Sequence, residues 1–327
     1  MNEPLSLFAK YRERISRDLA GREVPVVSKL RRPIQSLPFP YTAPTVPQTV
    51  DLPAKSGKTG TDFPTDWART ESSRRTRAVL LETMVKPVMA GLAQPTIRGI
   101  DRLDGMYGPL VFAANHHSHL DTPLLLTSLP APWRYRVVVG AAADYFFGTR
   151  ITATLSALVI GAIPIARTRA SRASTDLARD LIDEGWSFIV FPEGGRSPDG
   201  WGQPFQGGAA FIAHRTNTPV IPVHIEGTGR ILRKGKSTPT PSTTTITFGE
   251  PMHCRDGEDA RAFNTRIEAR VAELSDEAMT DWWAARKRAH SGETPTLTGP
   301  KTASWRRMWA LDDAAPSRRR QRRSWPR

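Results

Sequence analysis

The sequence predicts an α/β fold, a single mixed-sheet domain with helices on both faces, flanked by basic arms rich in Pro and Arg. Two observations predict it: short apolar runs alternate with helical periodicity in the middle of the chain, and the formal charge of +14 lies almost entirely outside that middle. Basic and acidic residues number 14 and 8 in 1–78, 23 and 22 in 79–300, and 9 and 2 in 301–327. We therefore expect a basic, Pro-rich N-terminal arm (1–78), a folded domain (79–290) and a basic, disordered C-terminal tail (291–327).

The elements are expected in an order that alternates strands with helices. The strands are predicted from short apolar runs at 110–114, 135–139, 187–191, 220–225 and 244–248. Helices are predicted at 122–129, where Pro123 suits the first turn, and at 174–184, where Ser174 or Thr175 can act as N-cap and Gly185 follows the end. A last helix is predicted over 261–289, because apolar residues recur there at spacings of three and four.

Composition excludes several classes of protein. A single cysteine, Cys254, rules out an internal disulfide framework and a zinc site built from several thiolates. The most apolar segments, 79–93 and 151–166, are interrupted by charge or proline or are too short to span a bilayer. The first 18 residues lack the apolar run of a signal peptide. We therefore expect no spanning helix, no secretion and a place on the cytoplasmic side.

The sharpest local feature is the heptapeptide Asn-His-His-Ser-His-Leu-Asp at 115–121, between a predicted strand and a predicted helix. Loops at this position carry function in α/β folds. Asp121 can turn back to hold one ring nitrogen of His116, which leaves the other nitrogen free to accept a proton from a substrate hydroxyl. Two alternatives exist: a loop histidine merely held by a helix-capping aspartate, and a metal site, which we do not expect because no second cluster of ligands accompanies the histidines.

Three further segments combine glycine or proline with polar or charged side chains. Residues 191–197 (Phe-Pro-Glu-Gly-Gly-Arg-Ser) predict a tight turn whose backbone N–H groups and arginine can converge on an anion, although alone they would suit an ordinary turn with a solvated arginine. Residues 161–167 (Gly-Ala-Ile-Pro-Ile-Ala-Arg) end an apolar run with Arg167. Residues 205–208 (Phe-Gln-Gly-Gly) precede the apolar segment 218–223.

In this order, the four segments resemble those of the glycerolipid acyltransferase family, the 1-acyl-glycerol-3-phosphate acyltransferases and their relatives. The resemblance covers about 79–251, which makes 79–290 the acyltransferase domain. It implies transfer of a fatty acyl group from a thioester of coenzyme A or acyl carrier protein to a hydroxyl of a lysophospholipid, most simply 1-acyl-glycerol-3-phosphate. It implies no cofactor beyond that thioester co-substrate and no metal.

The resemblance also assigns roles. His116 and Asp121 would be the catalytic base and its orienting partner. The acceptor phosphate would be held by Arg196, with Arg167 as second choice, in a turn built from Gly194 and Gly195 and supported by Glu193. Two departures leave the acceptor open: Gly195 stands where the family usually has Thr, and Gln206 where a Lys often precedes the glycines. A phosphodiester or glycolipid head group, with less charge than a phosphomonoester, is therefore an alternative acceptor.

The apolar run 145–165 is predicted either to line the groove for the acyl chain or to pack as ordinary core. The residues in question are Phe146, Phe147, Leu155, Leu158 and Ile160. Rival functions are a hydrolase that uses the same base with water, and a lipid-binding protein without catalysis. Nucleic acid is not expected as the main partner despite a pI near 10.5, because the middle of the chain is almost neutral.

The basic arms are predicted to bind an anionic membrane surface. Lys and Arg near such a surface contribute about 1 kcal/mol each, and tryptophan favours the membrane interface. The tail contains Trp305, Trp309 and Trp325 beside an arginine run, and the predicted last helix contains Trp282 and Trp283. The sequence therefore predicts a peripheral enzyme on the cytoplasmic face of the cell membrane.

Overall fold

The computed structural model describes residues 60–165, 172–234, 237–300 and 302. The chain divides into two units, 1–56 and 57–327, and all described residues belong to the second. Residues 1–59 of the expected N-terminal arm, Arg167 and the tryptophans of the tail lie outside the described residues.

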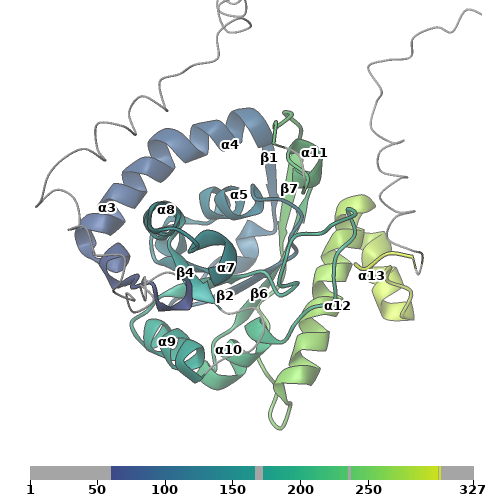
Figure 1. The fold of residues 1–327 in the computed structure, drawn as a ribbon. Helices are drawn as coiled ribbons and strands as arrows, with labels where there is room; N and C mark the ends of the chain where they lie inside the picture. The colour runs from purple at the N-terminus through teal and green to yellow at the C-terminus, as the bar shows by residue number, and fades with distance from the viewer. Residues whose placement is uncertain (1–59, 166–171, 235–236, 301, 303–327) are drawn as a thin grey trace, which may run out of the picture. The chain divides into compact units, whose positions relative to one another are not determined.

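A seven-stranded mixed sheet forms the centre of the domain (Figure 1). Its order is β1-β7-β6-β2-β5-β3-β4, and the five strands from β6 to β4 are parallel. β7 pairs antiparallel with β6, and β1 pairs parallel with β7 at the edge of the sheet. The strands are β1 (Pro95–Arg98), β2 (Val111–Ala114), β3 (Val137–Ala142), β4 (Ala162–Ile165), β5 (Ser187–Val190), β6 (Val220–Glu226) and β7 (Thr244–Phe248). The predicted mixed sheet with helices on both faces is confirmed.

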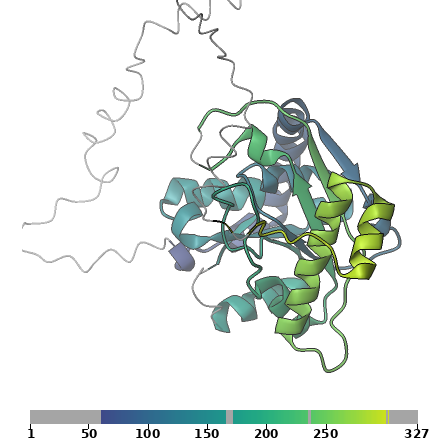
Figure 2. The same cartoon turned by 90° about the vertical axis from the view of Figure 1, so that its right-hand side faces the viewer.

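Helices cover both faces of the sheet because its central strands are buried on both sides. On one face, Phe112, Val223 and Phe248 pack with α4 (Lys86–Ala93), α5 (Asp121–Ser128) and α6 (Ala131–Arg134). On the other face, Val111, Phe188 and Val220 pack with α9 (Arg172–Asp183), α10 (Gly208–Thr216) and α12 (Ala260–Met279). Figure 2 looks onto α12 and its partner α13 (Trp282–Ser291).

The remaining elements are short or lie at the edges of the sheet. They are η1 (Gly60–Asp62), η2 (Asp66–Arg69), α3 (Glu71–Leu80), η3 (Leu81–Val85), η4 (Ile100–Leu103), α7 (Ala143–Phe146), α8 (Arg150–Ile160) and α11 (Thr228–Ile231).

The folded unit begins before residue 79. The predicted boundary between 78 and 79 falls inside α3, and the buried guanidinium of Arg77 donates to the carbonyl oxygens of Leu158 (2.7 Å) and Ala157 (2.9 Å) at the end of α8. Helical structure continues from α3 to α4 through η3, a π-helical turn just before Pro87. A wider turn accommodates a proline, which has no N–H to donate and clashes with a regular α-helical turn.

Two strands were missed and two predicted helices need correction. The short strands β1 and β4 were not predicted, and α9 begins at Arg172, so Ser174 and Thr175 are not its N-cap. The single helix predicted over 261–289 is two helices, because the Asp281 side chain accepts from the Ala284 N–H (2.9 Å) and starts α13 as a new helix.

The segment predicted to be disordered after 290 is described as far as residue 300. The Gly202 N–H donates to the carbonyl oxygen of Leu297 (2.9 Å), and Leu297 packs against the core on the α10 and α12 face. The expected tail therefore starts with a stretch that belongs to the domain.

Candidate active site

Three loops meet at one edge of the sheet because they follow neighbouring parallel strands. β2, β5 and β3 are adjacent, so their carboxyl ends place residues 115–121, 191–197 and 143–146 beside one another. The Ser197 N–H donates to the carbonyl oxygen of His116 (2.8 Å), which ties the first two loops together. Two motifs about 75 residues apart in the sequence thus form a single site.

A histidine and an aspartate form the centre of this site. His116 Nδ1 lies 2.9 Å from Asp121 Oδ2, and Asp121 is fully buried. Oδ2 also accepts from the backbone N–H groups of His117 (2.7 Å) and Ser118 (2.8 Å). Burial alone would raise the pKa of Asp121, but the hydrogen bond and charge of His116 and the Ser118 N–H outweigh it and lower the pKa.

The ionised Asp121 can only accept, so His116 carries its proton on Nδ1 and leaves Nε2 as a proton acceptor. The ring of His116 stacks on Phe191, with centroids 4.2 Å apart and planes at 24°, and it lines a cavity. These contacts fix both the orientation and the tautomer of the imidazole, with the geometry that a general base requires.

Buried polar side chains hold the loop of His116 in place. Asn115 bridges to β6 in both directions, since its Nδ2 donates to the Ile225 carbonyl (2.9 Å) and its Oδ1 accepts from the Ile225 N–H (2.7 Å). The Ser118 hydroxyl donates to the carbonyl oxygen of Leu232 (2.7 Å). Neither role was predicted from the sequence, although both residues belong to the heptapeptide at 115–121.

Glu193 lies beneath the two loops, outside the cavity lining. Its carboxylate accepts from the backbone N–H groups of His116 (2.9 Å) and Gln203 (2.9 Å), and it is 2% exposed. Burial raises the pKa of this carboxyl to about 7 despite both hydrogen bonds. The geometry is that of a loop support, and no sequence pattern predicts its partner Gln203.

The glycine turn after Glu193 opens toward the cavity. Gly194 has a φ of +70° and faces Gln206, which a Cβ atom would meet at 2.6 Å, so this position favours glycine. Gly194, Gly195 and Arg196 all line the cavity with His116. Among the described residues, no carboxylate forms an ion pair with Arg196. Arg196 is thus placed to bind an anion near the base.

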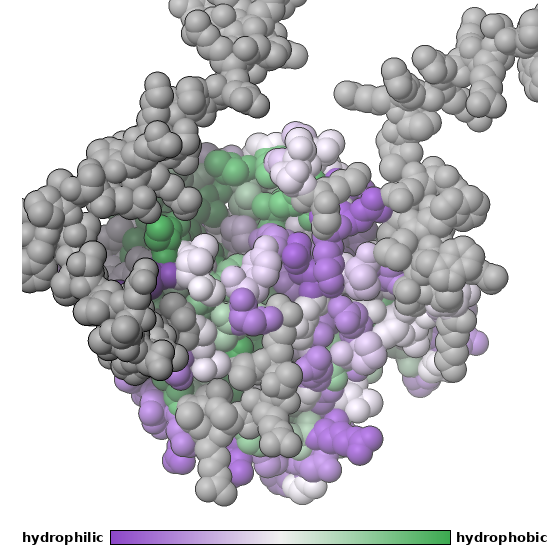
Figure 3. Space-filling view, in the orientation of Figure 1, coloured by the Kyte–Doolittle hydropathy of each residue, from purple (hydrophilic) through white to green (hydrophobic). Residues whose placement is uncertain are grey.

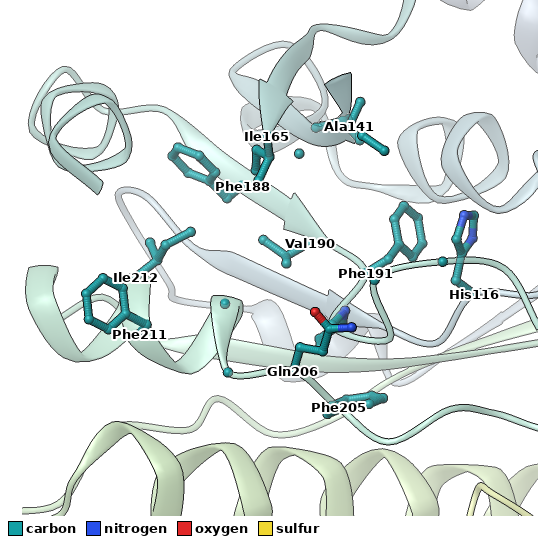
Figure 4. Close-up of a pocket in the computed structure, with 18 of the residues that line it drawn as sticks. His116, Ala141, Ile165, Phe188, Val190, Phe191, Phe205, Gln206, Phe211 and Ile212 are labelled. Carbon is teal, nitrogen blue, oxygen red and sulfur yellow. The ribbon is translucent and has the colours of Figure 1, made fainter. Parts of the chain in front are cut away.

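The cavity has a volume of about 800 Å³ and is apolar over most of its length. Figure 4 shows His116 and Phe191 at one end and Phe188, Val190, Phe211 and Ile212 around the other, with Gln206 between them. Of the run predicted to line a groove, Tyr145, Phe146, Ile160 and Ile165 line the cavity. Phe147 is instead buried in a cluster with α8, and Leu155 is exposed.

Two other histidines of the heptapeptide lie close by in different surroundings. His117 is largely buried, and burial lowers its pKa. His119 borders the cavity, and its Nε2 lies 2.9 Å from the hydroxyl oxygen of Tyr145. Within the described part of the chain, no three His, Cys, Asp or Glu side chains converge as metal ligands.

The chain is similar to known acyltransferases. Residues 94–226 match the Acyltransferase family. The chain is 33% identical over 142 residues to the chloroplastic 1-acyl-sn-glycerol-3-phosphate acyltransferase BAT2 of Brassica napus, an alignment that covers 42% of this chain and 39% of the relative. It is 27% identical over 192 residues to the 1-acyl-sn-glycerol-3-phosphate acyltransferase of Pseudomonas aeruginosa, covering 57% and 70%.

A solved structure shares the fold. The 1-acyl-sn-glycerophosphate (LPA) acyltransferase PlsC of Thermotoga maritima superposes with a TM-score of 0.50 at 23% identity, covering 65% of this chain and 87% of that one. The chain spans less than half the length of the plant relatives from Brassica napus and Arabidopsis thaliana.

Proposed function

Because residues 94–226 match the Acyltransferase family and the chain is similar to 1-acyl-sn-glycerol-3-phosphate acyltransferases, we propose that it transfers a fatty acyl group from an acyl thioester to the free hydroxyl of 1-acyl-glycerol-3-phosphate. The observation that carries the proposal is the pair of His116 and Asp121 at one end of an apolar cavity that also holds Arg196. A base, an apolar space and a cation are what acyl transfer to a phosphorylated acceptor requires.

The chemistry follows from the geometry of the base. Nε2 of His116 takes the proton of the acceptor hydroxyl, and the oxygen attacks the thioester carbonyl to give a tetrahedral oxyanion. That intermediate collapses and expels the thiolate, which takes up the proton that His116 removed from the acceptor hydroxyl. Asp121 stabilises the imidazolium in between, and general base help of this kind contributes about 10²–10⁴-fold in rate. No protein nucleophile takes part.

The apolar part of the cavity suits the acyl chain of the thioester. Phe188, Phe211 and Ile165 lie on different elements and face the same space. We propose that the chain lies there with its carbonyl near His116, and that Arg196 binds the acceptor phosphate. Coenzyme A and acyl carrier protein both remain candidate donors, and another lysophospholipid or a glycolipid is the alternative acceptor.

We further propose peripheral association with the cytoplasmic face of an anionic membrane, in phospholipid biosynthesis. Among the described helices, none has the length and apolarity to cross a bilayer. Apolar side chains are nevertheless exposed on α3, η3, α4 and α8, and Figure 3 shows apolar surface on that side of the molecule. These residues are Val79, Met84, Val88, Ile151 and Leu155. Such a patch, with the basic arms, would favour a lipid surface.

The proposal is tested with purified protein, a labelled acyl group on either coenzyme A or acyl carrier protein, and a panel of lyso-acceptors. We expect product of the mass of a diacyl-glycerol-3-phosphate, formed fastest from 1-acyl-glycerol-3-phosphate. A reaction without acceptor is the control. Release of free fatty acid at the same rate without acceptor would show a hydrolase, and absence of turnover with every donor and acceptor would refute the proposal.

A further inference from the structure

His119 and Tyr145 form a cluster that the mechanism above does not use. The imidazole and the phenol stack with centroids 5.1 Å apart at 24°, and His119 Nε2 lies 2.9 Å from the Tyr145 hydroxyl oxygen. Phe146 packs edge-on against the same imidazole at 5.9 Å. His119 follows β2 and Tyr145 follows β3, so the cluster is held from two elements. Its side chains border the cavity beside the base.

Arg196 completes this cluster. Its guanidinium carbon lies 6.0 Å from the centre of the Tyr145 ring, and both residues line the cavity with His119. Over the described residues, Arg196 has no carboxylate to neutralise it. A cation with no carboxylate partner among the described residues, next to two hydrogen-bonding side chains in one cavity, is suited to bind an anion.

The surroundings of His119 favour its neutral form at pH 7. Burial lowers its pKa to about 4, and the positive charge of Arg196 and the neighbouring His116 act in the same direction, while Asp121 opposes them. Tyr145 is its hydrogen-bond partner from α7. An anion bound to Arg196 would cancel the repulsion that Arg196 exerts on a protonated His119. The state of this imidazole therefore depends on whether the site is occupied.

We propose that His119 and Tyr145 complete, with Arg196, the subsite for the acceptor's phosphate, and that His119 becomes a second cation by taking up a proton when a phosphate monoester binds. This inference rests on the proposed function. A monoester carries nearly two negative charges at pH 7 and a diester only one, so a cation that forms on demand favours the monoester. A protonated His119 would also supply positive charge to a cavity whose lining has the neutral Gln206 at the position where a Lys often precedes the glycines.

The test is calorimetric binding of hexyl phosphate, and of a dialkyl phosphate for comparison, at pH 7 in two buffers of different ionisation enthalpy. We expect uptake of close to one proton with the monoester and much less with the diester. His119→Gln should abolish the uptake. His214→Gln, at an exposed histidine on α10 far along the chain from this loop, is the matched control and should leave it unchanged.

Kinetics give an independent measure. His119→Gln and Tyr145→Phe should raise the KM for 1-acyl-glycerol-3-phosphate about tenfold, because each removes a hydrogen bond to a charged group, with the thioester KM unchanged. Monoester binding without proton uptake, or an unchanged acceptor KM in both variants, would overturn the inference. A rise in the thioester KM alone would also overturn it, by assigning the cluster to the carrier.

The two proposals fail in different ways. If the wild-type protein transfers no acyl group but still takes up a proton with hexyl phosphate, the subsite stands and the proposed reaction falls. If transfer occurs and uptake does not, the proposed reaction stands and the role of His119 falls.

Discussion

Replacing Asp121 by asparagine separates catalysis from structural support at the centre of the site. Asp121 Oδ2 accepts hydrogen bonds from the His116 ring nitrogen and from the backbone N–H groups of His117 and Ser118, so this carboxylate could either stabilise an imidazolium or simply hold the loop before α5 in place. Asparagine keeps the shape and one accepting oxygen but removes the charge. A purely structural role in the loop therefore predicts a loss of stability, whereas a catalytic role predicts a loss of turnover in folded protein.

The size of the catalytic loss follows from the geometry. With ring nitrogen and carboxylate oxygen in contact at 2.9 Å, the centres of charge are about 4 Å apart, and an effective dielectric constant of about 20 gives about 4 kcal/mol of attraction for the charged pair. Because the imidazolium exists only as the reaction proceeds, this attraction lowers the barrier and corresponds to about 10³-fold in kcat.

The assay is steady-state turnover of labelled acyl thioester with saturating 1-acyl-glycerol-3-phosphate, together with urea unfolding of the same protein. We expect Asp121→Asn to lower kcat about 10³-fold while most of the protein remains folded. A variant that unfolds more easily but retains kcat within a factor of ten would refute the catalytic role and leave Asp121 as a structural support of the loop.

Three further changes test other parts of the account. Burial raises the pKa of Glu193 to about 7, so between about pH 4.5 and 7 this carboxyl is protonated in the folded protein and ionised in the unfolded chain. The stability that the group contributes is therefore lost as pH rises through 7. In urea unfolding, the free energy of unfolding of the wild type, relative to that of Glu193→Gln, should fall by about 3 kcal/mol between pH 4.5 and 8. A parallel pH dependence in both proteins would contradict this. Arg77→Met should lower the free energy of unfolding by about 3 kcal/mol, because three backbone carbonyls lose a charged donor; a change below 1 kcal/mol would show that water replaces it. A side chain at Gly140 would meet Ile165, because a Cβ atom there would lie 2.6 Å from the Ile165 Cδ1 atom. Gly140→Leu should therefore push Ile165 into the cavity and shift the preference toward shorter acyl chains by about tenfold. An unchanged chain-length profile would place the acyl chain elsewhere.

The sequence could predict the parts of the fold that rest on local patterns. The central strands are continuous apolar runs because both of their faces are buried, and that signal located β2, β3, β5, β6 and β7. β1 starts with Pro95 at the sheet edge and has three exposed residues, so it carries no such run. β4 follows α8 directly after Gly161, whose φ of +65° ends the helix, and the two together read as one apolar stretch.

In the candidate site too, the sequence could predict the local contacts but not the contacts between distant segments. His116 and Asp121 are five residues apart, so their pairing depends on one turn and could be inferred. The approach of Tyr145 to His119 and of Gln203 to Glu193 depends on which strands are neighbours in the sheet, and the order β2-β5-β3 is not encoded in any local pattern. The division of the last helix was missed because its apolar spacing continues across Asp281, whose side chain starts a new helix.

The central claim is that His116 is the base of an acyl transfer. Its most direct test is the turnover of His116→Ala with acyl thioester and 1-acyl-glycerol-3-phosphate, beside His116→Gln, which keeps a donor for Asp121, and His214→Ala as control. We expect both His116 variants to lose at least 10²-fold in kcat, with an unfolding transition close to that of the control. Wild-type turnover in a folded His116→Ala protein would contradict it.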